Sequence, residues 1–211
     1  HTRSYGDWSS DVCSSDLLAR MAVINGFPLR EVTIHARTAR QMYEGTVDVE
    51  AFAAALATCR HPVVYNGDLR TRADFLQLKA RFPQITRWMV GRAAAIDPFV
   101  FARLTTDTPP PRDAMRLKGF LDDYLAACEE ELYGPAAVLG RMKELWSYLH
   151  QAMVGGERLW KSVRVCRTVH EYRRVVDAAF AAFPGFVPDE ALRGLQPEVG
   201  VAARKKLSVG S

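Results

Sequence analysis

Three consecutive prolines, Pro109 to Pro111, divide the 211-residue chain into two parts of different character. Consecutive prolines cannot continue a helix or lie in a central strand, and they favour an extended, semi-rigid connector. We therefore expect a linker over residues 105–111. Before it, short β-branched runs alternate with helical segments, and after it the pattern is helical throughout.

The first part, residues 18–104, is predicted to be an α/β domain that begins with the end of a helix over residues 18–25. The expected strands cover residues 31–35, 61–65 and 88–90, and the expected helices cover residues 49–58, 71–82 and 93–104. Such alternation predicts parallel strands joined by crossover helices. A closed barrel of this type needs eight strands, so three strands form only a portion of one.

The second part, residues 112–195, is predicted to be an all-α helical bundle. Apolar residues recur at helical spacing over 115–128, 138–153 and 157–166. A fourth helix is expected to begin at Thr168, with Glu171 completing a capping box. The basic tail, residues 196–211, is expected to be disordered.

The opening segment, residues 1–17, shows neither a helical nor a strand period. Its run from Asp7 to Leu17 matches, residue for residue, the translation of a sequencing-library adapter. We interpret residues 1–17 as a non-native leader, with a natural disordered leader as the alternative.

Composition narrows the class of protein further. The chain has no apolar run long enough for a membrane helix, and its net charge of +4 permits an anionic partner without requiring one. Outside the leader the cysteines are Cys59, Cys128 and Cys166, which lack the spacing of a metal site. We expect a reducing, cytoplasmic setting and no metal.

Polar residues and glycines follow each of the three predicted strands. In parallel sheets of this kind, the chemistry lies at the carboxyl ends of the strands. Glycine lets a phosphate approach the backbone, and arginine supplies a forked cationic donor. Asn-Gly-Asp is also a common turn, and a single histidine is more often structural. The prediction of a site therefore rests on the three strand ends together and not on any one of them. The residues concerned are His35 and Arg37, then Asn66, Gly67 and Asp68, then Gly91 and Arg92.

These residues resemble the tRNA-dihydrouridine synthase family over about residues 30–190. The matching motifs are Ile34-His35-Ala36-Arg37-Thr38 with Tyr43 and Gly45, Pro62-Val63-Val64-Tyr65-Asn66-Gly67-Asp68, and Met89-Val90-Gly91-Arg92 with Pro98. Ala36 departs from the glycine usual in the family. Residues 140–149 are similar to the helical domain of the bacterial C-type branch.

The resemblance implies the last three strands of a (β/α)8 TIM barrel, followed by a tRNA-binding helical domain. It further implies an FMN enzyme that uses NADPH to reduce uridine in tRNA to 5,6-dihydrouridine, and a monomer in the complete enzyme. The family's catalytic cysteine and a flavin-contacting lysine lie in earlier strands that do not match this chain. No catalytic residue is therefore assigned, and the chain alone is expected to be inactive. The residues expected to bind the cofactor are His35, Asn66, Gly67, Asp68, Gly91 and Arg92.

The same resemblance implies a set of tRNA-binding residues, namely Arg37, Arg141, Lys143, Tyr148 and Arg164. Residues 157–174 also carry an excess of positive charge, although such a run is often a solvated helix face. Two alternatives to the synthase stay open. One is a non-catalytic basic RNA-binding helical module attached to a phosphate-binding half-sheet. The other is a different FMN or sugar-phosphate barrel enzyme, against which the helical part argues.

Overall fold

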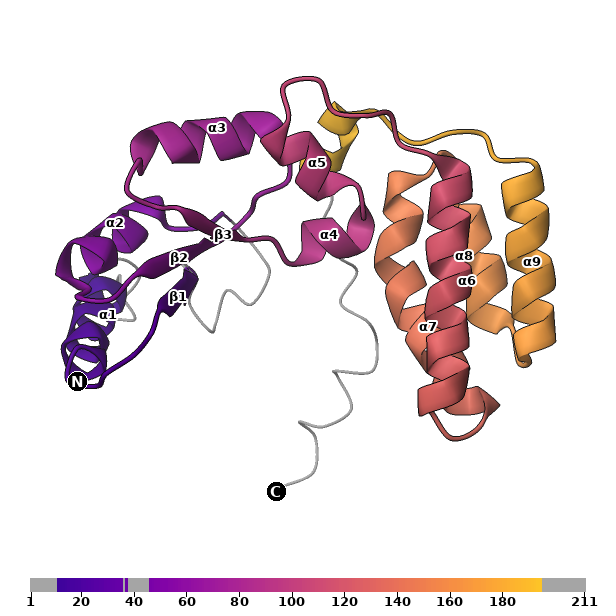
Figure 1. The fold of residues 1–211 in the computed structure, drawn as a ribbon, viewed down its shortest axis with the longest axis horizontal. Coiled ribbons are helices and arrows are strands. Elements are labelled where there is room, and N and C mark those ends of the chain that lie inside the picture. Colours follow the sequence, from indigo (N-terminus) through magenta and orange to yellow (C-terminus); the bar gives the residue numbers. More distant parts are fainter. Residues whose placement is uncertain (1–10, 36, 38–45, 195–211) are drawn as a thin grey trace, which may run out of the picture. The chain divides into compact units, whose positions relative to one another are not determined.

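The computed structural model describes residues 11–35, 37 and 46–194 (Figure 1). Its contacts divide the chain into two compact units, one of residues 1–69 and 73–91 and one of residues 70–72 and 92–211. The boundary therefore follows Gly91, and the predicted linker at 105–111 lies within the second unit. The predicted tail, residues 196–211, lies outside the described residues.

The first helix, α1 (Asp11–Ile24), starts earlier than the sequence pattern indicated. Residues 11–17 were expected to lack regular structure, and this expectation was wrong. Ser and Asp side chains in this stretch give no apolar period, so a helix here leaves no periodic signal. Residues 1–10 of the predicted leader lie outside the described residues.

The first unit contains a three-stranded parallel sheet in the order β1-β2-β3, which confirms the predicted strand direction. The strands are β1 (Val32–His35), β2 (Val63–Asn66) and β3 (Arg87–Met89), and the crossover helices are α2 (Val49–Thr58) and α3 (Arg72–Arg81). Strand β2 begins two residues later than predicted because Pro62 has no N–H for the ladder. Its carbonyl instead accepts from the N–H of Val32.

One face of the sheet is buried by aromatic packing. Ile34, Tyr65 and Trp88 lie side by side in register on this face. Tyr65 is fully buried and meets the ring of Phe52 from α2 edge-on, with centroids 4.7 Å apart. Trp88 meets Phe75 of α3 in the same way at 5.3 Å. Both helices are thereby held against this face.

The opposite face of the sheet, called the open face below, carries the alternate residues of each strand. Only Val64 among them is buried, and the others are exposed or partly exposed. The residues of the open face are Thr33, His35, Val64, Asn66, Arg87 and Met89.

The second unit starts with two short helices, α4 (Arg92–Ile96) and α5 (Val100–Thr105). The single helix predicted over 93–104 was wrong, because Pro98 disfavours helical backbone at Asp97 and interrupts the run. The next helices are α6 (Ala114–Glu131), α7 (Pro135–Leu149), α8 (Gly156–Val165) and α9 (Val169–Ala181). The predicted helix over 138–153 thus ends at Leu149 and continues as the 3-10 turn η1 (His150–Ala152); a second such turn is η2 (Asp189–Gly194).

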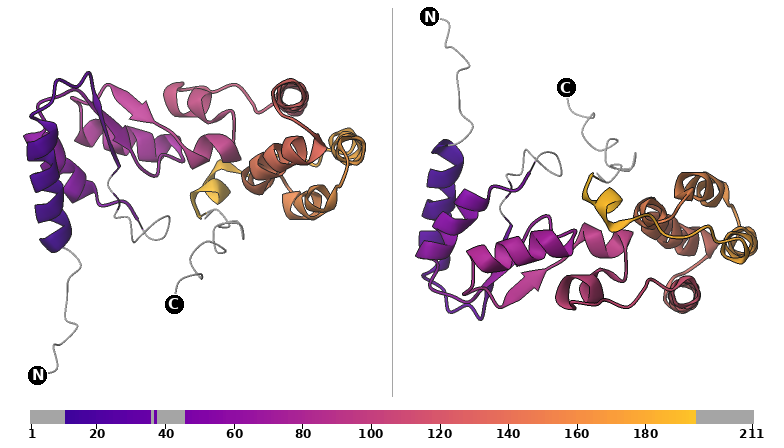
Figure 2. Two further views of the ribbon diagram at one scale, coloured as in Figure 1. Left: turned by 90° about the horizontal axis from the view of Figure 1, so that it is seen from below. Right: turned by 90° about the horizontal axis from the view of Figure 1, so that it is seen from above.

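Helices α6–α9 surround one apolar core, and Figure 2 views them nearly along their axes. Trp146 lies at its centre, fully buried, and its indole N–H donates to the hydroxyl of Tyr172 at 3.0 Å. That bond satisfies the polar atom of each ring, and burial raises the pKa of Tyr172.

A buried ionic network lies where α4 ends. The carboxylate of Asp97 accepts from the guanidinium of Arg103 at 2.6 Å and from the N–H of Phe99 at 3.0 Å. Arg103 also pairs with Asp189 at 2.9 Å, and Arg112 pairs with Asp189 at 3.0 Å. The network therefore joins α5, the segment before α6 and η2 within the second unit.

Replacing Arg103 by Met should destabilise the second unit strongly, because it leaves the Asp97 carboxylate buried without its closest cation. Removing one partner of a buried pair costs about 3–5 kcal/mol. The matched control is Arg173→Met, whose pair with Glu129 is exposed and contributes at most about 1 kcal/mol. Urea unfolding followed by circular dichroism measures both, and equal losses would contradict the assigned role of Arg103.

The predicted capping box at the start of α9 is confirmed. The hydroxyl of Thr168 accepts from the N–H of Glu171 at 3.1 Å. In return, the carboxylate of Glu171 accepts from the N–H groups of Arg167 and Thr168 at 2.7 and 3.3 Å. These backbone bonds hold the pKa of Glu171 below its usual value.

The lowered pKa of Glu171 predicts a pH dependence with a definite sign. The unfolded chain binds the proton more readily, so the contribution of Glu171 is present above the ordinary glutamate pKa and is lost as pH falls through the lowered pKa. The difference in free energy of unfolding between wild type and Glu171→Gln should therefore be largest near neutral pH and shrink as pH falls below the ordinary glutamate pKa. Glu130→Gln, an exposed residue of α6, should leave the acid dependence as it is in wild type.

Candidate functional site at the carboxyl ends of the strands

The strand register places three residues of the motifs in one row. His35 is paired with Asn66, and Asn66 with Met89, at the last position of each strand. All three belong to the open face, where His35 and Met89 are exposed and Asn66 is partly exposed. Paired strands lie about 5 Å apart, so an imidazole, an amide and a thioether line a single edge of the sheet.

Arg37 and Asp68, which follow β1 and β2, form an ion pair. The guanidinium of Arg37 donates to the Asp68 carboxylate at 2.5 Å, and the Arg37 side chain is only 2% exposed. Arg37 was predicted to contact tRNA and Asp68 to bind the cofactor, and the structure pairs these two residues with each other. The pair ties the segment after β1 to the segment after β2.

Gly67 is required by packing inside the protein. A Cβ atom at this position would lie 2.8 Å from Cγ1 of Val47 and 3.1 Å from the hydroxyl of Tyr65. Gly67 was predicted to let a phosphate approach the backbone, and the structure places Val47 and Tyr65 on the side where a Cβ would lie. Gly91 is different, since a Cβ there would meet nothing within 4 Å.

Tyr65 and Met89 belong to the surroundings of the site but were not selected from the sequence. Burial raises the pKa of Tyr65 to about 12, so its phenol stays protonated. The Tyr65 hydroxyl is buried and has no hydrogen-bond partner among the described residues. The alternation of side chains along a strand could have identified Tyr65 and Met89, because Tyr65 is the neighbour of Asn66 on β2 and Met89 is the last residue of β3.

Arg92 begins α4 and is partly buried in the second unit, whereas Gly91 ends the first. His35, Asn66 and Met89 all belong to the first unit.

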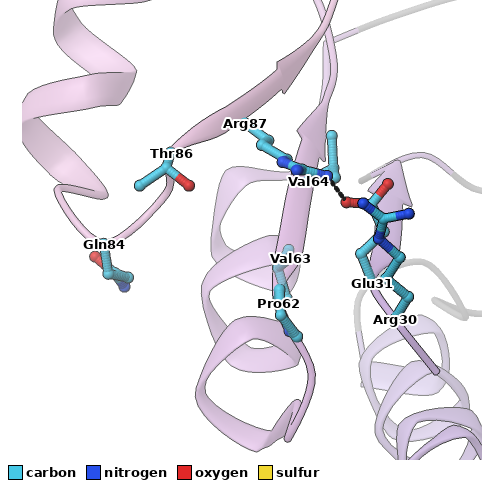
Figure 3. A pocket seen from close by; sticks show the side chains of 8 residues that line it. All are labelled: Arg30, Glu31, Pro62, Val63, Val64, Gln84, Thr86 and Arg87. Carbon is cyan, nitrogen blue, oxygen red and sulfur yellow. Dashed lines mark hydrogen bonds and ion pairs between the residues drawn. The ribbon is translucent and has the colours of Figure 1, made fainter. Parts of the chain in front are cut away.

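A pocket of about 220 Å³ lies at the other end of the strands (Figure 3). Its lining residues precede the strands or begin them, and Arg87 pairs with Glu31 at its rim. The motif residues at the carboxyl ends are not among them. The lining consists of Arg30, Glu31, Pro62, Val63, Val64, Gln84, Thr86 and Arg87.

The expected tRNA-binding residues of the second unit have different surroundings. Arg141 is exposed and pairs with Glu144 at 3.0 Å. Lys143 is partly buried and donates to the carbonyl of Cys166 at 2.7 Å. Tyr148 packs against the small cluster of Ile96, Ala152 and Leu192, and Arg164 is exposed. Within the described part of the chain, no hydrogen bond or ion pair joins any two of these four residues.

The basic run over residues 157–174 divides into paired and unpaired cations. Lys161 pairs with Glu157 at 3.4 Å and Arg173 with Glu129 at 2.7 Å. The remaining cations are exposed and form no ion pair with another described residue. They are Arg158, Arg164, Arg167 and Arg174.

Over residues 11–35, 37 and 46–194, no three His, Cys, Asp or Glu side chains gather in a way that could hold a metal ion. In the same residues, every helix is too short or too polar to cross a membrane.

Substituting Gly67 by Ala should destabilise the first unit by about 1–3 kcal/mol, because the added methyl group overlaps Val47 and approaches Tyr65. Gly91→Ala is the matched control, since its methyl group enters open space. Chemical denaturation of the two variants tests the difference. A Gly67→Ala variant as stable as Gly91→Ala would show that the packing around Gly67 yields without cost.

Comparison with known proteins relates the chain to one family. Residues 14–181 match the family model for dihydrouridine synthase (Dus). A probable tRNA-dihydrouridine synthase of Rhizobium leguminosarum is 31% identical over 106 residues, covering 50% of this chain and 32% of that protein. A probable tRNA-dihydrouridine synthase of Mycobacterium tuberculosis is 30% identical over 191 residues, covering 85% of this chain and 46% of the relative.

The tRNA-dihydrouridine synthase B of Escherichia coli K12 is 23% identical over 185 residues, covering 83% of this chain and 55% of that protein. The chain thus spans about half the length of the longer curated matches. The relatives from Xanthomonas campestris and Yersinia pestis are also named synthase B. These relatives carry the B-type name, whereas residues 140–149 suggested the C-type branch, so the match shows the family and the branch stays a prediction. Because the family model matches well over half of its residues, the chain belongs to the dihydrouridine synthase family.

Proposed function

We propose that this chain takes part in the reduction of uridine in tRNA to 5,6-dihydrouridine by an FMN enzyme that uses NADPH. One observation carries the proposal beyond family membership. The parallel register gathers His35, Asn66 and Met89 into a row on the open face, at the carboxyl ends of the strands. Barrel enzymes bind their cofactors and substrates at that end.

The residues present fit a flavin. FMN, when bound, supplies the hydride that saturates the uracil ring. Met89 offers an apolar contact for a flat ring, while His35 and Asn66 offer hydrogen bonds to its polar edge. All three are at least partly accessible on the open face.

Within the first unit, the phosphate end of the cofactor is assigned to Asn66, Gly67, Asp68 and Gly91, and a phosphate contact of Arg92 stays a prediction of the family resemblance. A carboxylate would repel a phosphate, but the guanidinium of Arg37 compensates the charge of Asp68 at 2.5 Å. The backbone around Gly91 has open space beside it, which suits a close approach. Gly67 contributes through backbone groups only, since its Cβ side is filled by Val47 and Tyr65.

No catalytic acid is assigned to this chain. The thiol of Cys59 donates to the carbonyl of His61, and Cys128 and Cys166 are buried in the helical core. None of them lies in the row at the strand ends. The general acid of the reaction is expected from the barrel strands that are not part of this match.

The RNA contact is assigned to the helical unit. Four cations on α8, α9 and the turn between them, Arg158, Arg164, Arg167 and Arg174, are exposed and form no ion pair with another described residue. Folded RNA is bound largely through shape and phosphate contacts, which suits cations displayed on rigid helices. Arg141 is also proposed to contact RNA. Its ion pair with Glu144 is exposed and weak, so a phosphate can replace Glu144 as its partner.

Titrating the 211-residue chain with FMN and following flavin fluorescence tests the proposed site. Asn66→Ala should weaken binding about tenfold, because it removes hydrogen bonds to a bound group. Thr33→Ala is the matched control, since Thr33 lies on the same open face but away from the carboxyl end. An equal effect of both variants, or a folded chain without saturable FMN binding, would count against the flavin site.

A further inference from the structure

The charged ammonium of Lys143 forms a hydrogen bond within the helical unit. Lys143 lies on α7, and its ammonium donates to the carbonyl of Cys166, 23 residues later, at 2.7 Å. Cys166 ends α8, where unpaired carbonyls and the helix dipole both favour a cation. Lys143 therefore closes the end of a neighbouring helix.

The residues that follow form a short connection between α8 and α9, called here the α8–α9 corner and made of residues 166–168. Side chains from α7 and α9 hold the backbone of this corner. Lys143 of α7 holds the carbonyl of Cys166, and Glu171 of α9 accepts from the N–H groups of Arg167 and Thr168. The side chain of Cys166 is buried and its thiol donates to Ser162 at 3.3 Å.

Exposed cations surround this fixed corner. Arg164 lies in the last turn of α8, Arg167 in the corner itself and Arg174 on α9. Arg167 and Arg174 are close enough to Glu171 to help lower its pKa. The three arginines outnumber the single carboxylate of Glu171, which is bonded to the corner backbone, so the region keeps a net positive charge that complements phosphate.

We propose that Lys143 is a positioning residue for RNA binding, which fixes the α8–α9 corner so that Arg164, Arg167 and Arg174 meet RNA phosphates. It acts through the bond to the Cys166 carbonyl, which is a different role from the direct tRNA contact that the family resemblance implied. This inference rests on the proposed RNA-binding function. Fixing the corner before binding reduces the ordering cost that binding would otherwise carry.

Amide hydrogen exchange in the free 211-residue chain tests the first half of the inference. Lys143→Met removes the bond to Cys166 and should speed exchange of the amides of residues 166–168 by about tenfold. Lys143→Arg retains a donor and should restore most of the protection. Arg116→Met, an exposed cation of α6, should leave exchange at the corner unchanged.

Binding of unmodified bacterial tRNA to the same chain tests the second half. Arg167→Met should weaken binding and lower the salt slope by about 1 in the wild-type background. In the Lys143→Met background the same substitution should have a much smaller effect, because a displaced corner no longer presents Arg167. Circular dichroism confirms that each variant is folded, and Lys143→Arg serves as the folded comparison.

The outcomes separate the inference from the proposed function. Wild-type exchange at the corner in Lys143→Met, or additive effects of Lys143→Met and Arg167→Met on tRNA affinity, would overturn the positioning role while tRNA binding stands. A wild-type chain without salt-dependent tRNA binding would overturn the proposed function and the inference with it. Faster exchange together with non-additive binding effects supports both.

Discussion

The position of Tyr65 is the constraint on which the candidate site depends. Its ring is fully buried between Phe52 and Trp88, which fixes the face of β2 that turns toward the helices. Because side chains alternate along a strand, Asn66 must then lie on the open face, in register with His35 and Met89. The Tyr65 hydroxyl also crowds position 67, two residues later, where a Cβ would lie 3.1 Å from it and 2.8 Å from Cγ1 of Val47. One aromatic residue therefore sets both the packing of the sheet and the composition of its edge.

Local sequence pattern was sufficient for part of this arrangement. The β-branched runs, separated by helical segments, indicated three parallel strands. The motifs at the ends of these runs indicated that the carboxyl ends of the strands lie together. Thr168 and Glu171 form the predicted capping box because that signal lies within four residues. The break at Asp97 was missed because the apolar pattern continues across Pro98. The Asp97 carboxylate forms ion pairs with Arg103 and Arg112, and a pattern of apolar residues does not show such contacts.

The charges were harder to predict than the helices. The sequence presents Arg37, Lys143 and Arg164 as members of one basic set, but the availability of a cation depends on acceptors far away along the chain. Arg37 meets Asp68 after 31 residues, and Lys143 meets the Cys166 carbonyl after 23. Arg164 is exposed without such a partner among the described residues. Three similar side chains thus take up different physical roles, which residue type and spacing alone do not distinguish.

In both units a partly buried cation fixes backbone beside a group that stays at least partly exposed. Arg37 ties the segments after β1 and β2 next to His35 and Asn66, and Lys143 holds the corner that carries Arg167. We expect loss of such a cation to move the neighbouring groups as well as to remove a charge, so that its effect on binding exceeds that of its own contact. A weakened variant therefore does not by itself identify a ligand contact. The distinction requires the coupling between the two positions, because a direct contact adds to its neighbour's effect and a positioning residue does not.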